Sequence, residues 1–169
     1  MLKKYYLDGL HVQKQIFRNL SISGESGIGS GSISAMSPWS REMIKTFPVK
    51  NWRNIRIRNY LILVKQLKKC AWLRVSGEIP PGTCPIMVPI IFDSVARRNY
   101  VGQRLIENSI YPAILWDLTN HVIDGISIQN IDLSQRILCI HCDMRYDEET
   151  MNRTANLIIL FAEQFCDTG

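Results

Sequence analysis

Apolar residues recur at helical spacing in several stretches of the chain, and turn-forming residues separate these stretches. The longest stretch runs from residue 51 to about residue 70, and Asn51 is its expected N-cap. A shorter helix is predicted over residues 38–46, because Ser37 and Pro38 form a favourable pair of N-cap and first helical residue.

Two further helices follow later in the chain. Asp93 or Ser94 is expected to cap a helix whose apolar stripe includes Val101 and Leu105. A last helix is predicted to begin at Asp147, with acidic residues in its first turn, where the helix dipole favours them.

Three short apolar runs bounded by turn residues predict strands, at residues 86–92, 110–116 and 136–142. Pro89 in the first run predicts an edge strand or a bulge, because proline has no N–H for a ladder. Pro112 excludes a helix from the second run, which ends on Trp116. The segment between the second and third runs is polar and is expected to form a loop with a short helix near its end.

This order predicts an α+β fold: a small few-stranded sheet covered on one face by helices, preceded by a long helix and an N-terminal arm. Residues 1–32 are assigned to the arm and a Gly/Ser loop, and residues 33–169 to one domain. The arm has mixed signals, either extended or helical, and a mobile loop is expected from Gly24 onward. Such a loop can present backbone N–H groups to a phosphate, but a plain connector is the favoured interpretation.

The composition indicates where in the cell the protein is located and what kind of partner it has. The chain has 169 residues with a hydrophobic fraction of 46% and a net charge of +5. No apolar stretch reaches the roughly 18 residues of a membrane span, so we expect a cytoplasmic protein without membrane contact. The basic residues of the long helix favour a solvated face or an acidic partner over nucleic acid; they are Arg53, Arg56, Arg58, Lys65, Lys68 and Lys69.

The five cysteines and the Cys-Ile-His-Cys run could in principle form disulfides or a metal site. Five cysteines are odd in number and too sparse for a disulfide scaffold, so reduced thiols are expected. In a strand, Cys139 and His141 share one face while Cys142 points away, and a second ligand pair at zinc spacing is missing. We therefore predict buried thiols and no metal.

Arg145 follows the third predicted strand and is the strongest candidate for binding an anion. A guanidinium at a strand end can bind a carboxylate or phosphate with two hydrogen bonds. The favoured alternative is a structural ion pair with one of the nearby carboxylates, Asp143, Asp147, Glu148 or Glu149. These residues alone name no reaction.

Two segments, IYPAILWDL and SQRILCIHCDMRYDEETM, give the chain a resemblance to a known family. They resemble the C-terminal part of fold-type I pyridoxal phosphate-dependent aminotransferases, nearest to the sugar-aminotransferase-like branch. The positions that keep the family's spacing are Arg98, Leu105, Ile110, Tyr111, Pro112, Trp116, Ser134, Asp143, Arg145, Tyr146 and Met151. Upstream, Trp52, Ile55, Arg58, Asn59 and Tyr60 resemble the long interdomain helix, so the resemblance covers roughly residues 30–169 and implies that residues 33–169 are the small domain.

The resemblance implies roles for six residues. Lys4 stands at the place of the Schiff-base lysine, although Leu10 replaces the second glycine that follows it in the family. Ser32 or Ser34 would reach the cofactor phosphate of a neighbouring protomer in a homodimer. Trp116, Arg145 and Tyr111 would line or support the substrate mouth.

The resemblance also implies pyridoxal 5'-phosphate in the intact relative. The large domain that forms most of the cofactor pocket should lie N-terminal and is absent from residues 1–169, so we expect this chain alone to bind no cofactor and to catalyse no transamination. It would be an enzyme only together with that missing domain. The alternative is a non-enzymatic oligomerisation or interaction module that keeps the fold, and a homodimer is expected under either hypothesis.

Overall fold

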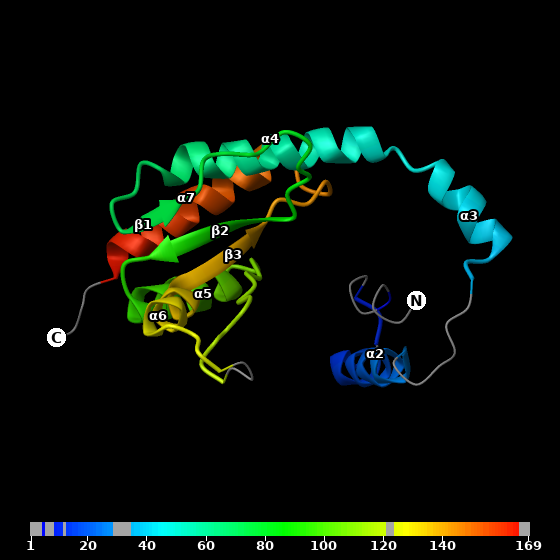
Figure 1. Ribbon diagram of the computed structural model, residues 1–169, viewed down its shortest axis with the longest axis horizontal. Helices are drawn as coiled ribbons and strands as arrows, with labels where there is room; N and C mark the ends of the chain where they lie inside the picture. Colours follow the sequence, from blue (N-terminus) through cyan, green and yellow to red (C-terminus); the bar gives the residue numbers. More distant parts are fainter. Residues whose placement is uncertain (1–4, 6–8, 12, 29–34, 121–123, 166–169) are drawn as a thin grey trace. The chain divides into compact units, whose positions relative to one another are not determined.

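Side chains of strand β2 (Met87–Phe92) alternate between the core and the opposite face of the sheet. Its fully buried positions are Val88, Ile90 and Phe92. β2 is the middle of a three-stranded antiparallel sheet in the order β1-β2-β3, with β1 (Leu73–Val75) and β3 (Ile137–His141) as its neighbours (Figure 1). The predicted strands at 86–92 and 136–142 are therefore present.

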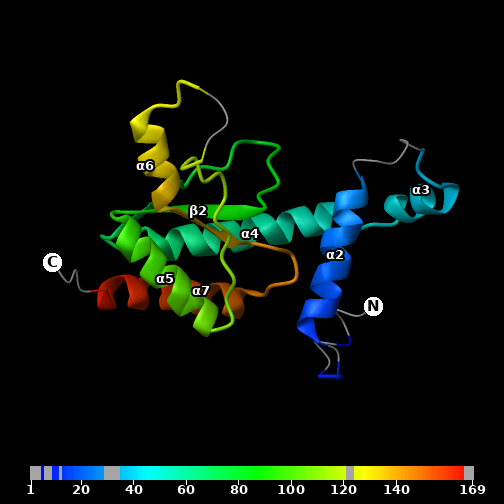
Figure 2. The ribbon, with the colours of Figure 1, turned by 90° about the horizontal axis from the view of Figure 1, so that it is seen from below.

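Three helices pack against the buried face of this sheet: α4 (Val49–Leu67), α5 (Val95–Glu107) and α7 (Glu148–Gln164). Figure 2 shows α5 and α7 side by side, on the same side of β2 as α4. The core residues that these helices contribute include Leu63, Leu67, Val101, Leu105, Ala155 and Ile158. A short helix, α6 (Ile128–Arg136), leads directly into β3. The predicted α+β fold, with helices covering one face of a small sheet, is confirmed.

The computed structural model describes residues 5, 9–11, 13–28, 35–120 and 124–165, and the chain divides into two compact units, Met1–Phe47 and Pro48–Gly169. The predicted domain boundary after residue 32 lies outside the described residues. No helix in the described part of the chain combines the length and apolarity needed to cross a bilayer.

The first unit contains α2 (Lys14–Ile28) and α3 (Pro38–Lys45). The mobile loop expected from Gly24 is wrong as far as Ile28, because this stretch continues α2. Hydrogen bonds between side chains four residues apart accompany the helix, one from Gln15 to Asn19 at 2.8 Å and one from Ser21 to Glu25 at 3.2 Å.

Local capping signals were reliable guides to three helices. Ser37 caps α3, Ser94 caps α5 and Asp147 caps α7, each accepting a hydrogen bond from a first-turn N–H. Asn51 was the wrong cap for the long helix, since α4 begins two residues earlier, directly after Pro48. The helix also ends at Leu67, and a turn then leads into β1, a three-residue strand that the sequence pattern did not predict.

Residues 110–116, predicted as a strand, form a single antiparallel bridge instead, between Ala113 and Cys139. Ser109 and Trp116 have left-handed backbones, with φ of 63° and 58°, so the chain turns sharply at both ends of the segment. The segment is therefore too short for a ladder along β3.

Pro89 lies in the central strand, so the predicted edge strand or bulge is wrong. Its cross-strand partner Cys139 exchanges both backbone hydrogen bonds with Ala113 on its other side, at 2.8 and 2.9 Å. Pro89 and Cys139 are therefore a non-hydrogen-bonded pair, and the Pro89 nitrogen faces the β1 side. β1 ends at Val75, which pairs with Ile90, so Pro89 lies just beyond the β1 pairing and interrupts no hydrogen bond.

This geometry predicts opposite effects of two neighbouring substitutions. Pro89→Val should change the free energy of unfolding by no more than about 0.5 kcal/mol, because no ladder hydrogen bond depends on position 89. Val88→Pro should cost at least about 2 kcal/mol, because it removes an N–H directed at β3 and leaves a carbonyl of that strand unpaired. Urea unfolding of the two variants measures both, and equal destabilisation would contradict the strand register.

Candidate functional site

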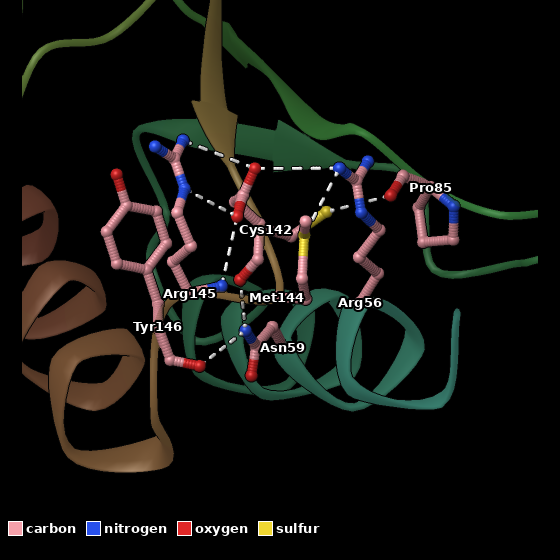
Figure 3. Close-up of polar contacts among 8 residues, drawn as sticks. Arg56, Asn59, Pro85, Cys142, Met144, Arg145 and Tyr146 are labelled. Atoms are coloured by element: carbon pink, nitrogen blue, oxygen red, sulfur yellow. Dashed lines mark hydrogen bonds and ion pairs between the residues drawn. The ribbon is translucent and has the colours of Figure 1, made fainter. Parts of the chain in front are cut away.

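The turn at residues 143–146, which follows β3, is attached to α4 by a buried amide. Asn59 is fully buried, and its Nδ2 donates to the backbone oxygens of Asp143 at 2.9 Å and Tyr146 at 3.0 Å (Figure 3). Arg58 in turn donates to Asn59 Oδ1 at 3.1 Å. The nitrogen and the oxygen of the Asn59 side chain are therefore both hydrogen-bonded. Through these bonds, α4 fixes the backbone of the turn that carries Arg145.

Two arginines share the carboxylate of Asp143. Arg145 Nε lies 2.9 Å from Asp143 Oδ1 and its Nη2 lies 3.3 Å from Oδ2, while Arg56 Nη2 approaches Oδ2 to 3.5 Å (Figure 3). The hydrogen bond from the Arg145 side chain lowers the pKa of Asp143, against the opposing effect of burial, and the charge of Arg56 adds to the lowering. The ion pair favoured from the sequence is therefore present, and the cluster keeps one positive charge in excess.

A cleft of about 260 Å³ lies beside this turn. It is lined by Ser109, Ile110, Tyr111, Ile140, His141, Arg145, Tyr146, Thr150, Met151, Arg153 and Thr154. Arg145 and Arg153 bring positive charge to the wall, and no aspartate or glutamate is among these lining residues. Figure 3 shows the Arg145 side chain extending next to Tyr146. The cleft therefore suits an anion with an apolar part.

The structure brings together only some of the residues predicted for the substrate mouth. Tyr111 and Arg145, far apart in sequence, line the same cleft. Trp116 does not line it, and its side chain is 73% exposed at the left-handed end of the 110–116 segment. Lys4, Ser32 and Ser34 lie outside the described residues, so their roles stay predictions.

The sequence analysis assigned no role at this cleft to Asn59, His141 or Arg153, although it named Asn59 in the long helix and His141 as a possible metal ligand. Asn59 had a detectable signal, since it stands four and eight residues before the core leucines Leu63 and Leu67, at a position where an apolar side chain is expected. Arg153 follows Thr150 by three residues on α7 and shares its face, but nothing local indicated that a cleft would form there.

Three of the four described cysteines, Cys70, Cys139 and Cys142, are buried, and Cys84 is exposed. Cys142 belongs to the core, donates to the backbone oxygen of Pro85 at 3.4 Å, and has its pKa raised to about 11, chiefly by burial. Burial also raises the pKa of Cys139, on the other face of β3. The four described cysteines are free thiols, and the described residues contain no cluster of three or more His, Cys, Asp or Glu able to hold a metal ion.

Comparison with known proteins finds structures that share the fold of this chain. No family model and no curated protein matches the chain. Among solved structures, the aminotransferase TlmJ from Streptoalloteichus hindustanus superposes with a TM-score of 0.57 at 13% identity, over 66% of this chain and 32% of that one. DesI, crystallised with its TDP-sugar product, has a TM-score of 0.56 at 13% identity, over 68% of this chain and 32% of that one. 3-Amino-5-hydroxybenzoic acid synthase has a TM-score of 0.53 at 16% identity, over 67% of this chain and 35% of that one.

The chain has the fold of the C-terminal portion of these aminotransferases. It spans about one third of the length of each of the three structures. The expected resemblance to the sugar-aminotransferase-like small domain is thus confirmed for the fold.

The residues that line the cleft do not fit pyridoxal phosphate. The cofactor needs a lysine beside its reactive carbon and separate groups for its phosphate and ring nitrogen. The residues lining the cleft include no lysine, and Asp143, the partly buried carboxylate next to it, is already held by two arginines. No step that involves the cofactor can be derived from this part of the chain.

Removing the Asn59 amide tests its role in holding the turn. Asn59→Ala should lower the free energy of unfolding by about 2–4 kcal/mol, because two buried hydrogen bonds to the turn are lost. Amide hydrogen exchange at Tyr146, whose N–H bonds to Asp143 across the turn, should also accelerate. Asn54→Ala, at an exposed position of the same helix, is the matched control and should stay within about 0.5 kcal/mol. Equal effects of the two variants would contradict the proposed attachment.

The lowered pKa of Asp143 predicts the direction of a pH effect. A carboxylate whose pKa is lower in the folded state stabilises the fold above its unfolded value of about 3.9, and this contribution is lost as the pH falls through the folded pKa. Asp143→Asn should therefore be less stable than the native chain at pH 7, and the difference should shrink as the pH falls through the lowered pKa of Asp143 in the folded state. Thermal unfolding from pH 2 to pH 7 measures the difference; a constant gap would show that Asp143 does not act through its charge.

Proposed function

We propose that this chain is the C-terminal, substrate-closing domain of a pyridoxal phosphate-dependent aminotransferase-like protein and is inactive alone. The observation that carries the proposal is the fold shared with the C-terminal portion of three aminotransferases, across two thirds of this chain and one third of theirs. The cleft that joins Tyr111 to Arg145 supports it, because a closing domain must supply groups that contact substrate.

In this proposal the domain binds and encloses while another part of the protein carries the reaction. Arg145, fixed by Asp143, would orient an anionic group of the substrate, and Tyr111 would form a wall beside it. Trp116 has the exposed ring expected of a residue that packs on substrate only after the large domain closes. Lys4 and the serines Ser32 and Ser34 keep their assigned roles as a Schiff-base lysine and as phosphate ligands across a homodimer.

A second function, an oligomerisation or interaction module without catalysis, is favoured by one specific observation. None of the eight residues of α3 is buried, although Trp39, Met43 and Ile44 are large and apolar. Apolar surface of this kind commonly meets a partner. The reading frame upstream of Met1 separates the two functions: a long continuous frame supports the closing domain, and an in-frame stop supports the module.

The first function predicts that the isolated chain gives no protein-bound absorbance band with pyridoxal phosphate and no amino transfer, because the cleft contains no lysine. Spectrophotometric titration followed by a transamination assay measures both. The contrary result is a visible band that Lys4→Ala removes and that Lys3→Ala, its matched control, leaves in place. That result would place a working cofactor site within these residues.

A further inference from the structure

We propose that the cleft binds a small organic monocarboxylate with an uncharged, apolar or aromatic body. The inference deepens the proposed function by naming a ligand class for residues assigned to the substrate mouth, and its biological meaning rests on that function. The physical basis lies in the cleft itself, so the binding can be measured on the isolated chain.

The charge of the cleft indicates an anion. Asp143 occupies Nε and Nη2 of Arg145, and these contacts leave Nη1 for a ligand. The side chain of Arg153 makes no hydrogen bond or ion pair with any described residue, yet it lines the same cleft. A planar guanidinium held by one carboxylate, with a second arginine in the lining of the same cleft, is an arrangement suited to a carboxylate ligand.

The size and remaining lining indicate what the anion is attached to. Ile110, Ile140 and Met151 provide aliphatic surface, and Tyr111 and Tyr146 provide aromatic surface. The volume of about 260 Å³ lies just below the range of about 300–1,000 Å³ that is usual for pockets holding drug-sized ligands. One ring with its carboxylate fits such a space, whereas a nucleotide needs a larger cleft.

Two other anion classes fit less well. A zwitterionic amino acid brings an ammonium group, and no lining residue of the cleft is an aspartate or glutamate that could pair with it. A free phosphate has no apolar part to cover the aliphatic and aromatic side chains that line the cleft. The N–H of Thr150 is also already bonded to Asp147, at 2.8 Å.

Isothermal titration of the purified chain with sodium benzoate tests the proposal. One molecule should bind per chain, and Arg153→Met should weaken binding about tenfold, the loss of one charge-assisted hydrogen bond. Arg153 has no partner among the described residues, so this variant should fold normally. The matched control is Arg41→Met, an exposed arginine of α3, which should leave binding unchanged. Arg145→Met should also weaken binding, and its thermal unfolding shows whether the turn survives the change.

Three comparison ligands decide the class. Methyl benzoate, L-phenylalanine and inorganic phosphate should each bind at least about tenfold more weakly than benzoate, since each lacks one required property. Equal binding of the methyl ester overturns the role of charge, and equal binding of L-phenylalanine or phosphate overturns the ligand class. No benzoate binding, or unchanged binding by Arg153→Met, overturns the site. Any of these failures leaves the upstream reading frame, and thus the proposed function, to be judged separately.

Discussion

The structure of the cleft depends on one buried amide. Asn59 occupies a core position of α4, where an apolar side chain would pack well but would leave the Asp143 oxygen without its donor and the Tyr146 oxygen with only the 3.5 Å bond from Arg58. Its two N–H groups bond to the oxygens of Asp143 and Tyr146, the first and last residues of the turn. Because a buried polar group is stable only when its partners are all in place, the amide fixes the turn in a single arrangement. The start of α7, and with it the far wall of the cleft, follows two residues later.

The charged residues around this turn form one network of ion pairs, which holds the turn and also orients Arg145 toward a ligand. Asp143 compensates Arg145 and Arg56 together, and this pairing holds the guanidinium of Arg145 in place without neutralising the cluster. Arg58, which braces Asn59, also lies 3.6 Å from Glu148. The Arg145 side chain is 74% exposed, so Asp143 orients the guanidinium while it stays accessible to a ligand.

Local signals in the sequence were enough for the elements that depend on local chemistry. Ser37, Ser94 and Asp147 marked helix starts, because capping is decided within a few residues. β1 was missed because a three-residue strand has no readable period and is stabilised by its pairing with β2. The same distinction applies to the candidate site. Arg145 could be predicted from its place after a strand, whereas Arg153 lines a cleft only because the loop after α5 packs opposite it.

The position of Pro89 also bears on how the chain behaves at high concentration. The sheet has two open sides, and β1 covers only half of β2. An invading strand that tried to extend the β1 side would meet the proline nitrogen, which has no hydrogen to donate, directly after Ile90. On the other side, the bridge at Ala113 already occupies Cys139 in the middle of β3. Pro89 and the Ala113 bridge therefore each block one position at which the strand of another molecule could pair with the sheet.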